Sequence, residues 1–151
     1  MGDVLKSAYL RSKAAEYLQH FIGFPYLWGG NDPMSGFDCS GLIVEVLQAV
    51  GIIPNKSDYT AAALYERFDK GAIDRGYMGC LVFWYGSDKK EKIIHVEMMI
   101  DDFHTVGASG GGSRTTSLAA AIAENAFIKM RPLSYRGERY LIADPFKVED
   151  E

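Results

Sequence analysis

Two residue types in this chain can act together as a nucleophile and a base: cysteine, present twice, and histidine, present three times. Cys39 directly follows Asp38, a residue type that caps helices, and precedes apolar residues at helical spacing. The free N–H groups and dipole of a helix N-terminus favour the reactive thiolate form of cysteine. The same N–H groups can stabilise the oxyanion that forms when a thiolate attacks a carbonyl. Cys39 is therefore the candidate nucleophile, although buried first turns also contain cysteines without a chemical role.

The candidate base is His95, in the middle of the strand-like segment KIIHVEMMI. Strand alternation fixes the face that its ring takes, and packing can then hold the ring in place. A core histidine with a hydrogen-bond partner is the alternative interpretation. His20 lies near the end of a predicted helix and His104 beside a predicted turn, so both are weaker candidates. Cys80 lies in the apolar run GCLVFWYG and is expected to be a buried structural thiol.

The elements that must position these residues are predicted to be helical first and extended later. Helices are predicted over 5–22, 39–51 and 59–68, and strands over 80–85, 92–100, 104–109, 126–133 and 139–145. This segregation predicts a single α+β domain over 1–151, with N-terminal helices packed on a C-terminal antiparallel sheet of about five strands. The glycine- and serine-rich segment 107–117 is expected to be a mobile loop, and the acidic end 147–151 to be frayed.

Composition excludes several classes of function. No run of apolar residues is long enough to span a membrane, and the N-terminus lacks the hydrophobic region of a secretory signal. We therefore expect a chain that is made in the cytoplasm, with reduced thiols. The net charge of −4, with both signs interspersed, gives no basic stripe, so nucleic acid is not an expected partner.

Three blocks of the sequence resemble the NlpC-type family of papain-like cysteine peptidases, which cut bonds in peptidoglycan stem peptides. The block PYLWGGNDPMSGFDCSGLI resembles the nucleophile signature of the family, GCLVFWYG its first sheet strand, and IHVEMMI followed by VGAS its histidine hairpin. Together they span about residues 25–109. The resemblance implies a papain-like fold, with Cys39 as nucleophile and His95 as general base and acid.

The resemblance also implies a set of substrate-binding residues, which are Tyr26, Trp28, Asp38 and Ser40. A carboxylate in a cleft recognises an ammonium group, and a phenol beside a thiolate can donate a hydrogen bond to it or to the oxyanion. Each residue also has a structural interpretation. Asp38 and Ser40 could simply cap the helix, and Trp28 could pack into the wall of the site.

The chain departs from the family at the position that usually orients the catalytic histidine. A polar residue is usual there, but counting through the hairpin places that position on Gly107. Glu97, on the same strand face as His95, lies opposite Gly107 if the turn holds an odd number of residues. We therefore expect the Glu97 carboxylate to fill the space at Gly107 and to orient or charge His95. The alternatives are a backbone carbonyl or Ser109 as the orienting group, or a site that has lost activity.

The function implied by the resemblance is a peptidoglycan endopeptidase or amidase that acts through an acyl-enzyme without metal or cofactor. Its partners would be stem peptides or muropeptides. Without an export signal, such an enzyme would need another route to its substrate. Phage tail, lysis or injection machinery is the favoured expectation, and recycling of muropeptides in the cytosol is the alternative. The alternatives are a catalytically impaired wall-binding or structural module of a tail assembly, and an acyl hydrolase or transferase of the same fold with another amide or ester substrate.

Overall fold

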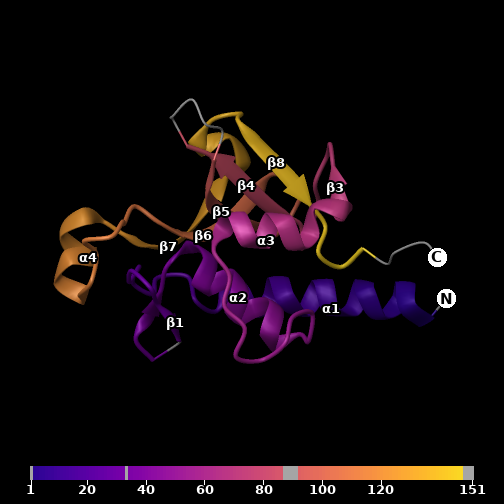
Figure 1. Ribbon diagram of the computed structural model, residues 1–151, viewed down its shortest axis with the longest axis horizontal. Coiled ribbons are helices and arrows are strands. Elements are labelled where there is room, and N and C mark those ends of the chain that lie inside the picture. The colour runs from indigo at the N-terminus through magenta and orange to yellow at the C-terminus, as the bar shows by residue number, and fades with distance from the viewer. Residues whose placement is uncertain (1, 33, 87–91, 148–151) are drawn as a thin grey trace.

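In the computed structural model, three helices pack on one side of a twisted antiparallel sheet (Figure 1). They are α1 (Gly2–Gln19), α2 (Cys39–Ala49) and α3 (Ala61–Phe68), and they coincide with the three predicted helices. The structure describes residues 2–32, 34–86 and 92–147, and side chains from residue 5 onward. Most of the acidic end expected to be frayed lies outside these residues.

The helix α2 is the central element, because its apolar residues recur at helical spacing and are buried on both sides. Asp38 caps its N-terminus, accepting a hydrogen bond from the Gly41 N–H at 2.7 Å. Gly51 follows with a positive φ of 78°, a conformation that suits glycine at the end of a helix. The sequence thus fixes both ends of the helix, and with them the position of Cys39 in its first turn.

The second layer is a six-stranded antiparallel sheet in the order β3–β8–β4–β5–β6–β7. Its strands are β3 (Ala72–Ile73), β4 (Leu81–Tyr85), β5 (Ile93–Met99), β6 (His104–Ser109), β7 (Phe127–Pro132) and β8 (Tyr140–Ala143). The five predicted strands are all present. The sixth, β3, has two residues and is too short to give an alternating pattern.

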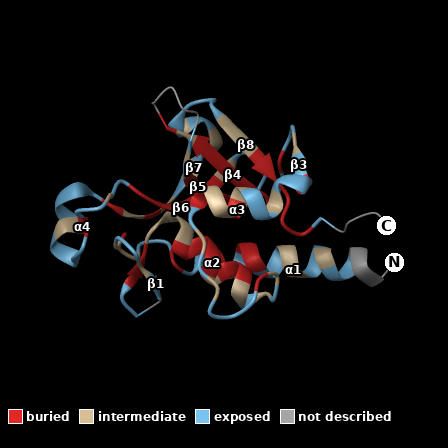
Figure 2. Cartoon of the chain, in the orientation of Figure 1, coloured by how far each residue is buried: buried red, intermediate tan, exposed pale blue. Residues whose placement is uncertain are grey.

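Alternating side chains place two different clusters on the two faces of the sheet. Val96 and Met98 on β5 belong to the large core that includes α2, whereas Val82 and Trp84 on β4 belong to a smaller cluster. Figure 2 shows that the buried residues are concentrated in α2 and in the central strands of the sheet. Because residues alternate, His95 shares its face with the smaller cluster rather than with the large core.

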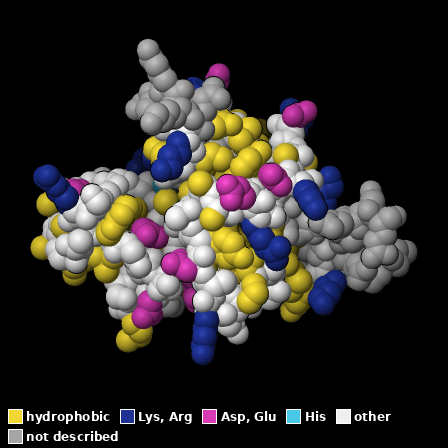
Figure 3. All heavy atoms as spheres, in the orientation of Figure 1, with side chains coloured by type: hydrophobic (Ala, Val, Ile, Leu, Met, Phe, Trp, Pro, Cys, Tyr) yellow, Lys and Arg dark blue, Asp and Glu magenta, His cyan; other side chains and the backbone are white. Residues whose placement is uncertain are grey.

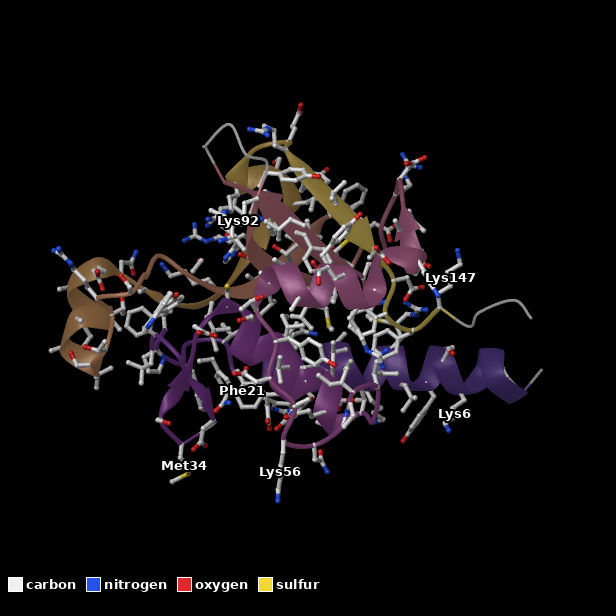
Figure 4. The ribbon with its side chains drawn as sticks, in the orientation of Figure 1. Lys6, Phe21, Met34, Lys56, Lys92 and Lys147 are labelled. Atoms are coloured by element: carbon white, nitrogen blue, oxygen red, sulfur yellow. The ribbon has the colours of Figure 1, made fainter. Side chains whose placement is uncertain are left out.

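Several short elements were not predicted. A seven-residue helix, α4 (Leu118–Glu124), stands apart from the other helices (Figure 1), and only Ala121 in it is buried. Two-residue strands β1 (Asn31–Asp32) and β2 (Gly36–Phe37) form a hairpin, from which Met34 points outward (Figure 4). Two short 3₁₀ helices, η1 (Asp69–Gly71) and η2 (Leu133–Arg136), are also present in the described residues.

Segment 107–117, which the sequence analysis expects to be a mobile loop, is partly a strand and is tied to its surroundings by hydrogen bonds. Its first three residues are part of β6, and Thr115 is fully buried. The Thr115 hydroxyl donates to Glu124 at 2.6 Å, and the Thr115 carbonyl accepts from the Trp28 N–H at 2.8 Å. These bonds tie the segment to α4 and to the loop before Cys39.

Among the described helices, none is both long and apolar enough to cross a membrane. On the face shown in Figure 3, Lys and Arg side chains lie scattered among acidic and apolar ones. This face therefore carries no continuous basic surface within the described residues.

Candidate active site

Cys39 is the first residue of α2 and is partly exposed. The loop before it is held against the helix by Asp38, whose second carboxylate oxygen accepts from the Gly29 N–H at 3.0 Å. A Cβ at Gly41 would lie 1.9 Å from the Gly30 carbonyl oxygen, so only glycine allows the loop to pass this closely. The backbone N–H groups at the start of α2 lie next to Cys39 in the chain, where they can stabilise an oxyanion.

His95 lies between the Cys39 thiol and the Glu97 carboxylate. Its Nε2 is 2.6 Å from Glu97 Oε2, and the Cys39 side chain lies close enough to the ring to raise the His95 pKa. Since Nε2 contacts Glu97, Nδ1 is the ring nitrogen left for Cys39. The ring is 4% exposed, and Trp84, its cross-strand neighbour, packs beside it with ring centroids 5.6 Å apart.

Glu97 is fully buried and occupies the space that Gly107 leaves. A Cβ built on Gly107 would lie 2.2 Å from Glu97 Cγ, so no other residue type fits there without displacing the carboxylate. The strands β5 and β6 pair at Met98–Val106, which makes Glu97 and Gly107 the next opposing positions. The large Glu97 side chain thus fills the space opposite the small Gly107, and its carboxylate contacts His95.

Glu97 also accepts two hydroxyl hydrogen bonds, neither of which the sequence analysis anticipated. Thr105 Oγ1 donates to Oε1 at 2.7 Å, and the Tyr135 hydroxyl donates to Oε2. Thr105 could have been found, because it lies two residues before Gly107 on the same face of β6. Tyr135 has no such signal, because it reaches the site from η2 after β7 ends.

The ionisation of the pair follows from competing effects. Burial disfavours the imidazolium of His95, but hydrogen bonds and charges from Cys39 and Glu97 outweigh burial and raise its pKa. Burial likewise disfavours the Glu97 carboxylate, but hydrogen bonds from His95, Tyr135 and Thr105 lower its pKa. The two shifts agree in direction, and both favour the charged form, an imidazolium facing a carboxylate.

Tyr26 is 5% exposed, and it lies close enough to Cys39 and Asp38 for electrostatic interactions with both. Burial and these two neighbours raise its pKa, which keeps the phenol protonated as a hydrogen-bond donor. A Cβ at Gly111 would lie 2.4 Å from the Tyr26 ring, so this glycine lets segment 107–117 pass over the tyrosine. Trp28 is 55% exposed, so its ring is not packed into a wall of the protein.

A small pocket of about 120 Å³ is lined by the residues that flank Cys39 in the chain, but not by Cys39 itself. Asp38 and Ser40 line it together with Asp58 and Tyr59, which precede α3. Burial raises the pKa of Asp38, and the backbone hydrogen bonds from Gly41 and Gly29 oppose this shift. Larger hollows of about 250 and 330 Å³ lie on other parts of the surface, away from Cys39.

The remaining sequence candidates lie away from this site. His104 bonds Asp101 through Nδ1 at 3.0 Å beside the turn after β5, and Cys80 is fully buried. Burial raises the Cys80 pKa to about 11. Within the described stretches, no group of three or more His, Cys, Asp or Glu side chains is arranged to hold a metal ion.

A helix that begins at a thiol and packs on an antiparallel sheet with a histidine on its central strand β5 is the arrangement of an α+β papain-like fold. Residues 23–132 match the model of the NlpC/P60 family, and the chain belongs to this family.

Curated relatives include the bifunctional muramidase/DL-endopeptidase CwlT of Bacillus subtilis, which is 31% identical over 99 residues, covering 65% of this chain and 29% of the relative. The murein DD-endopeptidase MepH of Escherichia coli is 37% identical over 73 residues, covering 47% of this chain and 26% of the relative. The chain thus spans less than a third of the length of either relative.

Solved structures share the fold. An NlpC/P60 family protein from Bacillus cereus superposes with a TM-score of 0.72 at 22% identity, over 91% of this chain and 40% of the other. The P60 domain of the M. avium subspecies paratuberculosis antigen MAP1204 has a TM-score of 0.65 at 20% identity, over 94% of this chain and 98% of the other. The α+β papain-like fold expected from the sequence is confirmed.

Proposed function

We propose that this chain is a cysteine endopeptidase or amidase that hydrolyses amide bonds in peptidoglycan stem peptides. The observation that carries the proposal is the buried His95 ring, which lies between the Cys39 thiol and the Glu97 carboxylate. The contact between Glu97 and His95 argues against an impaired module, because a polar group contacts the histidine despite Gly107. Relatives named as murein and DL-endopeptidases support peptidoglycan as the substrate class.

The reaction takes two steps. The Cys39 thiolate attacks the amide carbon, and the oxyanion that forms is stabilised by N–H groups of the first turn of α2 and by the Tyr26 hydroxyl. His95 gives its proton to the leaving nitrogen, so the C–N bond breaks and a thioester remains on Cys39. A water molecule then attacks the thioester, His95 takes its proton, and the C–S bond breaks to release the acid and the thiolate.

The pocket beside Cys39 supports recognition of a positively charged group. Asp38 and Asp58 place two carboxylates around about 120 Å³, and Ser40 adds a hydroxyl. A stem peptide with a free amino group would place its ammonium there. Asp38 also caps the helix, so the same carboxylate has a structural and a binding role.

The test is cleavage of purified muropeptides, followed by mass spectrometry, with the unmodified protein, Cys39→Ala and Cys80→Ala. We expect cleavage by the unmodified protein and by Cys80→Ala, which serves as the matched control, and none by Cys39→Ala. Acetylating the free amino group of the substrate should lower kcat/KM if the acidic pocket binds it. Cleavage by Cys39→Ala at the normal rate would show that the thiol is not the nucleophile.

A further inference from the structure

Two donors share one oxygen of the buried carboxylate. The hydroxyl of Tyr135 donates to Oε2 of Glu97, and the same oxygen lies 2.6 Å from Nε2 of His95. Tyr135 belongs to η2, and it is 38 residues away from Glu97 in the chain. The turn after β7 therefore brings a third side chain to the His95–Glu97 pair.

Tyr135 is not required to hold Glu97 in place. The other carboxylate oxygen, Oε1, is held by the Thr105 hydroxyl at 2.7 Å. The side chain is also wedged against Gly107, where no Cβ could be added without a clash. What Tyr135 adds is a second hydrogen bond to the oxygen that faces the histidine.

The ring of Tyr135 is itself fixed by its neighbours. It packs edge-on against Trp84 with centroids 6.1 Å apart, and the Arg131 guanidinium lies 5.3 Å over the ring centroid. Burial raises the pKa of Tyr135, with the Glu97 charge adding to the shift, so its hydroxyl keeps its proton. Tyr135 is therefore a permanent donor at neutral pH.

We propose that Tyr135 is a positioning residue that acts through Glu97 to weaken the hold of the carboxylate on the His95 proton. Without Tyr135, the Oε2 oxygen would accept from the imidazolium alone, bind it more tightly and make it a poorer acid. General acid catalysis needs the imidazolium to release its proton to the leaving nitrogen near neutral pH. The effect on turnover rests on the function proposed above, whereas the effect on His95 ionisation does not.

The other charged and titratable groups around the pair come from three elements: Cys39 on α2, Arg131 on β7, and Arg136 beside Tyr135 on η2. Tyr135→Phe leaves each of them in place and keeps the aromatic ring against Trp84. Tyr140→Phe is a matched control, because Tyr140 also packs edge-on against Trp84, at 6.0 Å. Within the described residues, no hydrogen bond from its hydroxyl is present.

The experiment is a pH titration of the His95 ring by ¹⁵N NMR, with the signal assigned by its loss in His95→Gln. We expect Tyr135→Phe to raise the pKa of His95 by about one unit and Tyr140→Phe to leave it unchanged. Because Tyr135 acts through Glu97, Glu97→Gln combined with Tyr135→Phe should titrate like Glu97→Gln alone. An unchanged or lowered pKa in Tyr135→Phe, or a further shift in the double variant, would overturn the proposal.

Turnover gives a second readout. On muropeptides, Tyr135→Phe should lower kcat about tenfold with KM unchanged, and the alkaline limb of kcat/KM should move to higher pH. An equal loss of kcat/KM at all pH values, with the alkaline limb unshifted, would indicate a structural role for Tyr135 and contradict the proposal. If no muropeptide is cleaved even by the unmodified protein, the proposed function fails, and the NMR titration still decides the role of Tyr135.

Discussion

Glu97 and Asp144 are both buried carboxylates that pair with a basic side chain and accept a hydrogen bond from a tyrosine hydroxyl. Glu97 pairs with His95 and accepts from Tyr135, whereas Asp144, after β8, pairs with Arg11 of α1. The Arg11 pair is bidentate at 2.9 and 3.0 Å.

The difference between the two clusters lies in the base. Arginine stays protonated at any ordinary pH, so the Arg11–Asp144 pair can only hold α1 against the end of the sheet. The Tyr77 hydroxyl donates to Asp144 at 2.6 Å, and the guanidinium lies over the Tyr77 ring at 5.0 Å. Histidine gains and loses its proton near neutral pH, so a similar arrangement around His95 can move a proton. Similar hydrogen bonds thus stabilise the fold in one region and can support chemistry in the other.

The largest expected effect comes from removing the charge at Glu97. Glu97→Gln keeps the size of the side chain but removes the negative charge that stabilises the imidazolium. We expect kcat on muropeptides to fall about a thousandfold while the protein stays folded. Steady-state kinetics with circular dichroism checks both parts, and an unchanged kcat would show that the Glu97 contact has no catalytic role.

The matching change in the other cluster is Asp144→Asn, which leaves Arg11 without its charged partner. We expect the free energy of unfolding to fall by about 3 kcal/mol, with kcat within about twofold of normal at 25 °C. Hydrogen bonds from Arg11 and Tyr77 outweigh burial and lower the pKa of Asp144 below its ordinary value of 3.8. Its contribution is therefore present above about pH 4 and is lost as the pH falls further.

Urea unfolding of both proteins between pH 3 and 8 measures this difference. The difference in free energy of unfolding between the unmodified protein and Asp144→Asn should be constant above about pH 5 and shrink below about pH 4. A gap that grows on acidification, or a loss of kcat as large as that of Glu97→Gln, would remove the distinction between the two clusters.

A smaller effect is expected from Gly107→Ala, which tests the space that Glu97 occupies. The added Cβ would lie 2.2 Å from Glu97 Cγ, so the carboxylate must move away from His95. We expect a loss of about 1–3 kcal/mol in the free energy of unfolding and a fall in kcat of about tenfold. Gly112→Ala is the control, because its Cβ would meet nothing within 4 Å. If the two variants had the same free energy of unfolding and the same kcat, the tight fit between Glu97 and Gly107 would be contradicted.

The sequence predicts those features that depend on local patterns. Helical spacing and the Asp38 cap place Cys39 at the start of α2, and strand alternation with an odd turn places Glu97 opposite Gly107. The helix α4 is missed because its seven residues span only about two turns, which is too short for the apolar spacing to distinguish a helix from a loop.

The contacts that complete the two clusters could not be predicted, because they join segments that are distant in the chain. Tyr135 reaches Glu97 from a turn 38 residues later, and Arg11 reaches Asp144 across 133 residues. No spacing rule relates such positions. Their hydrogen bonds follow from how β7, β8 and α1 pack, which is a property of the whole fold.

The most direct test of the account is covalent labelling with a chloromethyl ketone built on a stem peptide, in which Cys39 Sγ bonds the methylene carbon and chloride leaves. Intact-mass and peptide mass spectrometry at pH 7 should show one adduct, on Cys39, and none on the buried Cys80. Labelling should slow sharply in Glu97→Gln and stay normal in Asp144→Asn. An unlabelled Cys39 in a protein that cleaves muropeptides would contradict the central claim.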